Sequence, residues 1–111
     1  MTVTVKTIIP RKQAENAQTT QYTAVNCKTI IDKFTVTNTT GAPVNFSVNL
    51  VVSGGAAGAD NRVLSVKAIA AGETYTCPEV VGQTLEASGF ISTLASAATS
   101  LTISAAGREI T

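Results

Sequence analysis

The side chains that could take part in catalysis are few and scattered along this chain. Its candidate acid and base groups are carboxylates in separate turns and strand-like segments: Asp32, Asp60, Glu73, Glu79 and Glu86. A glycosidase-like site needs two carboxylates held close together, and no pair is adjacent in this sequence. The chain also has no histidine, the side chain that most often moves protons near neutral pH. We therefore predict that the protein is not an enzyme.

Metal and cofactor sites find equally little support. Asp60 and Asn61 offer two oxygens beside the glycine-rich loop Ser53–Asp60, whereas calcium takes about six to eight oxygen ligands. That loop also lacks the lysine and the following helix of a phosphate-binding loop. Cys27 and Cys77 stand alone, without the C-x-x-C spacing of a zinc site. We expect no cofactor and no metal, and the two cysteines are either reduced core thiols or a disulfide within or between subunits.

The composition indicates one domain that spans residues 1–111 and is built from sheets. Small and β-branched residues dominate, with two tyrosines, three phenylalanines and no tryptophan, so the core is expected to be thin and aliphatic. Two sheets packed face to face suit such a core. Charged residues make up 14% of the chain, against about a quarter in an ordinary protein. A surface with so few charges is easily desolvated, which favours contact with other subunits.

Charge and hydropathy argue against two classes of partner. The formal net charge is +1 and the charged residues are dispersed, so no field attracts a phosphate backbone. No window approaches the ~20 apolar residues of a membrane helix, and the N-terminus does not read as a secretory signal. We expect neither a nucleic-acid partner nor a membrane.

An alternation of apolar and polar residues with a period of two runs through the chain and is clearest in V-N-F-S-V-N-L-V-V, residues 44–52. It predicts a strand with Val44, Phe46, Val48, Leu50 and Val52 facing a core. Shorter strand-like segments surround it: Met1–Ile9, Tyr22–Cys27, Thr29–Asn38, Arg62–Ile69, Thr74–Cys77, Thr84–Ala87, Phe90–Ala95 and Leu101–Ala105. The spacing predicts an all-β fold, an antiparallel β-sandwich or jelly-roll-like domain with about eight strands.

The segment 10–21 interrupts this pattern. Strand-like residues end at Pro10, and Arg11–Gln21 is polar apart from two alanines. We expect either an exposed loop or an arm that becomes ordered only in an assembly. Deletion of Met1–Gln21 is then predicted to leave a folded domain that no longer joins its assembly.

Candidate contact residues follow from the expected strand edges and outward faces. The terminal strands Thr2–Ile8 and Leu101–Ala105 are expected to be open edges that pair with a neighbour. The polar row Asn45, Ser47 and Asn49 faces outward, either toward another subunit or simply toward solvent. The full set of predicted interface residues is Thr2, Val3, Val5, Arg11, Lys12, Tyr22, Asn45, Ser47, Asn49, Tyr75 and Phe90.

One long part of the chain resembles a known group of proteins. The segment Ala70–Ile110, together with T-V-T-N-T-T-G at Thr35–Gly41 and V-V-S-G-G at Val51–Gly55, resembles small β-sandwich structural proteins of tailed bacteriophages. The likeness covers roughly Thr29–Ile110. At Phe90 the chain departs from the acidic residue that often follows the hairpin glycine in that group.

The resemblance implies a virion component, assembled in the host cytoplasm. A capsid decoration or cement subunit is the first expectation, a homo-oligomer, with a trimer favoured, that also binds a shell protein. The alternatives are a subunit of the collar, tail or fibre region, or a carbohydrate-binding module on the particle surface. Sugar binding would use Tyr22, Tyr75 and Phe90 as aromatic platforms.

Overall fold

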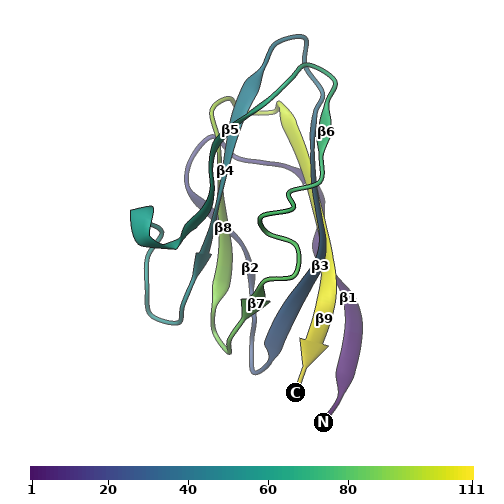
Figure 1. The fold of residues 1–111 in the computed structure, drawn as a ribbon, viewed down its shortest axis with the longest axis vertical. Helices are drawn as coiled ribbons and strands as arrows, with labels where there is room; N and C mark the ends of the chain where they lie inside the picture. The colour runs from purple at the N-terminus through teal and green to yellow at the C-terminus, as the bar shows by residue number, and fades with distance from the viewer.

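Two antiparallel sheets packed face to face form the protein, as a computed structural model of residues 1–111 shows (Figure 1). The first sheet has the order β1 (Val3–Gln13), β9 (Leu101–Ile110), β3 (Lys28–Asn38) and β6 (Thr74–Tyr75), and β7 (Thr84–Leu85) also pairs with β3. The second has the order β2 (Thr19–Thr23), β8 (Phe90–Ala95), β4 (Val44–Val51) and β5 (Arg62–Ile69). A short 3₁₀ turn, η1 (Ala59–Asn61), precedes β5. The predicted all-β sandwich is confirmed.

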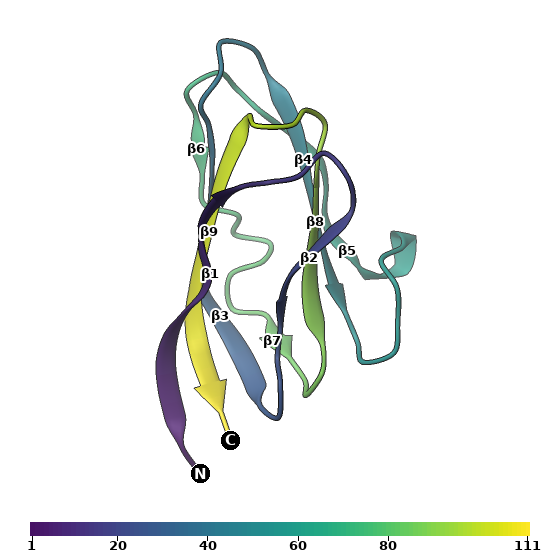
Figure 2. The ribbon, with the colours of Figure 1, turned by 180° about the vertical axis from the view of Figure 1, so that it is seen from behind.

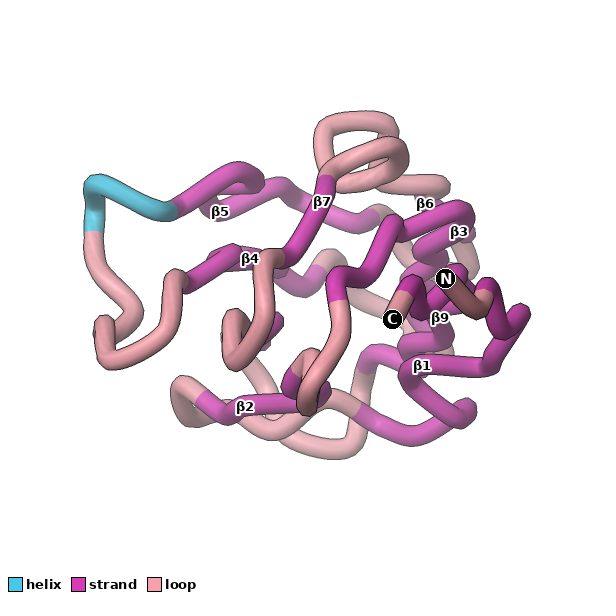
Figure 3. Tube along the Cα trace, turned by 90° about the horizontal axis from the view of Figure 1, so that it is seen from below, coloured by secondary structure: helices cyan, strands magenta, loops and turns pink.

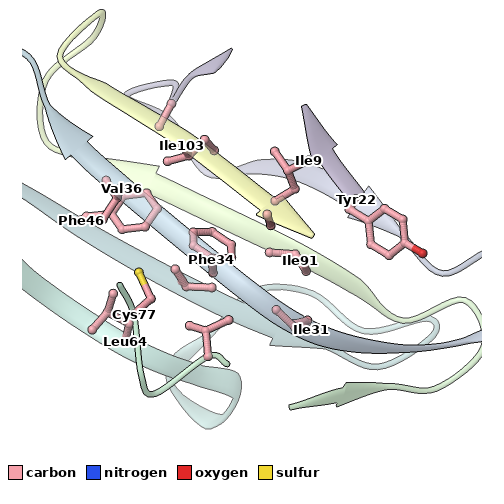
Figure 4. Close-up of a cluster of buried hydrophobic side chains, with 14 of the residues drawn as sticks. Ile9, Tyr22, Ile31, Phe34, Val36, Phe46, Leu64, Cys77, Ile91 and Ile103 are labelled. Carbon is pink, nitrogen blue, oxygen red and sulfur yellow. The ribbon is translucent and has the colours of Figure 1, made fainter. Parts of the chain in front are cut away.

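The core between the sheets is aliphatic, with one aromatic contact at its centre. Phe34 of the first sheet and Phe46 of the second lie with ring centroids 6.2 Å apart and are fully buried (Figure 4). Branched aliphatic side chains from both sheets surround them, including Ile9, Ile31, Val36, Ile91 and Ile103. Such burial removes apolar area from water at about 25 cal/mol per Å², which is the main force holding the layers together.

The alternating segment behaves as predicted over most of its length. Val44, Phe46 and Val48 are buried in the core, and Leu50 packs against its margin. The prediction for Val52 is wrong, because β4 ends at Val51 and the Val52 side chain is 72% exposed. The chain leaves the sheet there and enters a turn, so Val52 has no opposite sheet to pack against.

Most of the segment 10–21 belongs to strands, and only its residues 14–18 form a loop. β1 continues to Gln13 and β2 begins at Thr19, which leaves only residues 14–18 between them. The Ala14 amide donates to the Leu101 carbonyl at 2.8 Å, and the Ala95 amide donates to the Glu15 carbonyl at 3.1 Å. This stretch therefore passes from the first sheet to the second and is bonded to both (Figure 2).

Two physical reasons explain why the sequence was misleading there. Register shifts interrupt the pairing of β1 with β9 around Ile9, so Pro10 sits in an edge strand at a bulge, where its missing N–H is tolerated. The polar composition reflects an exposed strand. Ile8, Ile9 and Ala14 are nevertheless buried, so deletion of Met1–Gln21 would remove part of the core and is not a test of an arm.

The connection between β6 and β7 covers the side of the sandwich that lies opposite β1 and β2 (Figure 3). Cys77 and Val80 are fully buried there. The Gly82 amide donates to the Ile31 carbonyl at 2.7 Å, and the Ile31 amide donates to the Gln83 carbonyl at 3.0 Å. These bonds hold the connection against β3.

The last strand, β9, is longer than predicted and lies inside its sheet. It reaches Ile110 and pairs with β1 on one side and with β3 on the other. The expectation that Leu101–Ala105 forms an open edge is therefore wrong. Strand order comes from long-range pairing, which the period of two does not specify. The structure contains no helix with the length and apolar character to span a membrane.

Candidate interaction surface

The N-terminal half of β1 forms an open sheet edge at the end of the molecule where both termini lie (Figures 1 and 2). Its pairing with β9 runs without interruption from Val3 opposite Ile110 to Thr7 opposite Ala106. The predicted contact residues Thr2, Val3 and Val5 are all exposed here. Val5 is 80% exposed, an unusual state for a valine inside a regular strand.

The backbone groups that face this edge can be identified from the pairing. Thr2 and Thr111 exchange two hydrogen bonds, of 3.2 and 3.0 Å. In an antiparallel pair such residues alternate with residues whose N–H and C=O point the other way. Val3, Val5 and Thr7 therefore direct their backbone groups to the open side. We call the stretch 2–7 the free edge.

The second half of β1, unlike the free edge, carries features that hinder pairing with another strand. Two bulges, Pro10 and the cations Arg11 and Lys12 follow Thr7, and these are common devices against edge pairing. Lys12 also has a partner, because its Nζ lies 2.9 Å from a Glu15 carboxylate oxygen. The bonds from Lys12 and Gln21 lower the pKa of Glu15. Arg11 is exposed, so of this predicted pair it is the more available for contact.

Charge next to the free edge is internally balanced. On the outer face, Arg108 stands opposite Val5 in the β1–β9 register and binds Asp32 through Nε and Nη2 at 2.9–3.2 Å. This bond raises the pKa of Arg108. Lys6 lies 3.4 Å from Glu109. A strand that pairs with the free edge would therefore contact valines and threonines, and the charged residues beside them already pair with each other.

Tyr22 was predicted to be a contact residue, and its burial in the core excludes that role (Figure 4). Its hydroxyl bonds to Thr29 at 2.8 Å and donates to a carboxylate oxygen of Glu109. Burial and the neighbouring Glu109 raise the pKa of Tyr22. The position faces inward because the bulge in β2 between Thr20 and Tyr22 changes the alternation of that strand.

The polar row of β4 divides into one exposed and two buried residues. Asn45 is exposed, whereas Ser47 and Asn49 are 3% and 0% exposed, so the expectation that the row meets solvent or another subunit is wrong for these two. Ser47 Oγ accepts a bond of 2.8 Å from the Val66 amide. Segments beyond β4 cover its outer face, which the alternation alone could not indicate.

Asn49 is the centre of a polar network that sequence reasoning missed. Its Nδ2 donates to the Gly58 carbonyl at 2.9 Å and to Asn61 Oδ1 at 2.6 Å. Its Oδ1 accepts from Arg62 Nε at 3.2 Å and from Gln18 Nε2 at 3.5 Å. Arg62 Nη2 also donates to Gln18 Oε1 at 3.3 Å. The network fastens the loop before β5 and the 14–18 connection to the second sheet.

A shallow pocket of about 260 Å³ opens beside this network on the outer face of the second sheet. Its lining is mixed, polar and apolar, and consists of Asn16, Asn45, Ser47, Arg62, Val66, Leu94, Ala95 and Ser96. No aromatic side chain takes part. No signal in the sequence joins these residues, since they come from four separate segments. The structure holds no group of three or more His, Cys, Asp or Glu side chains placed to ligate a metal.

The remaining aromatic candidates are partly covered. The Tyr75 hydroxyl donates to Glu79 at 2.7 and 2.8 Å, and Lys67 Nζ lies 5.0 Å from the ring centroid. The bond to Glu79 raises the pKa of Tyr75 to about 12 and lowers that of Glu79. Phe90 is half-buried opposite Val51. The structure does not bring Tyr22, Tyr75 and Phe90 together as one platform.

Both cysteines are free and buried, so the structure has no disulfide at the candidate pair. Cys27 Sγ lies 3.7 Å from Thr29 Oγ1, near one end of the core. Cys77 lies in the β6–β7 connection near Leu64 (Figure 4). Burial, with a smaller effect of Glu79, raises the pKa of Cys77 to about 12.

Comparisons with known proteins bear on the fold alone. No family model matches the chain, and no curated protein matches it. One chain of the solved structure of infectious bursal disease virus, Gx strain, is similar, with a TM-score of 0.54 and 13% sequence identity. The match covers 98% of this chain and 33% of that chain. The protein thus spans about a third of the length of its structural neighbour and shares its β-sandwich fold.

Proposed function

We propose that the protein is a structural subunit of a virus particle, in particular a capsid decoration or cement subunit of a bacteriophage. In this role it binds copies of itself and a shell protein, by adding strands to open sheet edges. The observation that carries the proposal is the free edge. Its regular backbone and exposed valines are what strand addition needs, because main-chain bonds supply affinity and side chains supply fit.

Three further features support this role. The fold is shared with a chain from the structure of a virus, infectious bursal disease virus. The segment Thr29–Ile110 resembles small structural proteins of tailed bacteriophages. Charged residues are few, at 14%, and the ion pairs beside the free edge are already closed. Such a surface loses little hydration when a neighbour covers it.

The particle location is tested by finding the chain in an intact particle of the virus that encodes it. A density map is expected to show sandwiches of 46 × 26 × 20 Å on the outer surface of the shell. Sandwiches on the collar, tail or fibre would keep the structural role and replace the decoration role. Particles that lack the chain altogether would refute both.

A carbohydrate-binding module is the weaker alternative. Its three expected aromatic platforms are either buried, as Tyr22 is, or partly covered, as Tyr75 and Phe90 are. Glycan binding by the purified protein that is lost in Tyr75→Ala would favour this alternative.

A further inference from the structure

Five strands lie at sheet edges, and they differ in how well they could accept another strand. β6 and β7 have two residues each, and β2 has five residues with a bulge. β5 contains two register shifts, and Val66 within it has a left-handed backbone, with φ of 48°. Only the free edge of β1 combines regular pairing with several consecutive residues open to one side.

We propose that the free edge pairs antiparallel with the free edge of a second copy of this chain, with Thr4 of each copy on a two-fold axis. This inference rests on the proposed function, because it names the contact through which copies join. The first sheets of the two copies would then become one continuous sheet. An isologous contact of this kind is the commonest way in which identical subunits associate.

The backbone allows only certain registers. Val3, Val5 and Thr7 direct N–H and C=O groups outward, whereas Thr2, Thr4 and Lys6 use theirs toward β9. Odd-numbered residues must therefore face odd-numbered residues of the second copy. With Thr4 on the axis, Val3 of each copy faces Val5 of the other. A shift by two residues, with Val5 on the axis, would place Val3 opposite Thr7, so only the Thr4 register sets both valines of each copy opposite valines.

The side chains favour the same register. Val3 and Val5 point to the same face, so the two-fold brings two valines of each copy into one apolar group. Val3 and Val5 are 49% and 80% exposed in the single chain, and this contact would cover them. Lys6 faces Thr2 of the second copy, so no like charges oppose each other. Lys6 keeps its partner Glu109, which lies within its own sheet.

The contact is short, and we expect a weak dimer in solution that copies on a particle would reinforce by multivalency. Sedimentation of the purified full chain from micromolar to millimolar concentration is expected to show a reversible monomer–dimer equilibrium. Val5→Lys places a charge on the free edge and should weaken dimerisation at least about tenfold. Val52→Lys, at a valine that is 72% exposed and directly follows β4 of the second sheet, should not.

Disulfide trapping tests the register. Thr4 would face Thr4 of the second copy in a non-hydrogen-bonded pair, with a Cα separation of about 4.5 Å that suits a disulfide. Thr4→Cys should therefore form a covalent dimer on mild oxidation, and Val5→Cys should not. The reverse pattern would overturn the proposed register. The native cysteines are buried and should not interfere.

Failure of this inference and failure of the proposed function give different results. A chain that remains monomeric at millimolar concentration, or a dimer that Val5→Lys leaves intact, overturns the self-pairing. Attachment of the monomeric chain to particles would still support the proposed function in that case. Dimers with the expected register that attach to no particle would overturn the proposed function and leave the pairing in place.

Discussion

The hydroxyl of Tyr22 donates a hydrogen bond to the carboxylate of Glu109 and thereby links the two sheets near the end that carries the free edge. Since a carboxylate only accepts, the Tyr22 proton points to Glu109, and the Thr29 hydroxyl donates to Tyr22. Glu109 also lies 3.4 Å from Lys6 of β1. A buried tyrosine in one sheet thus helps to position the edge strand of the other.

Tyr22→Phe should lower the free energy of unfolding by about 1–2 kcal/mol, because Thr29 and Glu109 lose a partner in a largely buried site. Urea unfolding measures this change. Tyr75→Phe is a matched control, since its hydroxyl bonds to Glu79 on the exposed surface. That control should cost less than about 0.5 kcal/mol. Equal losses in the two variants would contradict the linking role of Tyr22.

Acid should weaken the same site. The bond from Tyr22, with a smaller contribution from Lys6, lowers the pKa of Glu109 despite the opposing effect of burial. A carboxylate whose pKa is lowered in the folded protein stabilises the fold at pH values above its pKa in the unfolded chain, about 4.3. This stabilisation is lost as the pH falls through the pKa of the folded state. The free energy of unfolding should therefore decline below about pH 4. Glu109→Gln should make that decline shallower, and an unchanged decline would show that Glu109 does not contribute.

Asn49→Ala should lower the free energy of unfolding by about 2–3 kcal/mol, because it removes a fully buried amide with four hydrogen-bond partners. Asn45→Ala is the control: Asn45 lies on the same strand as Asn49, but its side chain is exposed, so its removal should have almost no effect. Thermal unfolding of both variants provides the comparison. A mild Asn49→Ala variant would mean that water replaces the network easily.

Gly107→Ala should separate β9 from β3. A Cβ at this position would overlap the Ile30 carbonyl oxygen, a backbone atom of the neighbouring strand β3. We expect a loss of about 3 kcal/mol, read from the midpoint of urea unfolding. Gly41→Ala is the control, because no atom lies within 4 Å of the added methyl group. A tolerated Gly107→Ala would show that the two strands adjust to the added group.

Neither thiol should react with a thiol reagent in the folded protein. Both cysteines are buried, and the pKa of Cys77 is raised to about 12, so the reactive thiolate is scarce at pH 8. Ellman's reagent should label both residues only after unfolding in urea. Reducing agent should leave the unfolding midpoint unchanged. Rapid labelling of the native protein would indicate that the β6–β7 connection opens.

The sequence by itself determined the class of fold and much of the core. Alternation with a period of two states which side chains share a face of a strand, and hydrophobicity states which face is buried. Val44, Phe46 and Val48 followed that rule because β4 lies in the middle of its sheet. The valines of β1 could also be recognised as contact candidates, because the first strand of the chain was expected at an open sheet edge.

The tertiary structure decided which edges are open and which polar residues are hidden. β9 became an interior strand, and Asn49 and Tyr22 became buried because the 14–18 connection, the loop before β5 and Glu109 reach them from distant segments. Bulges at Pro10 and Thr20 then changed the alternation locally. The neighbours of each strand depend on pairing between distant segments and on what covers each face of the sheet. A local pattern therefore predicts that two sheets form, but not which strands lie at their edges.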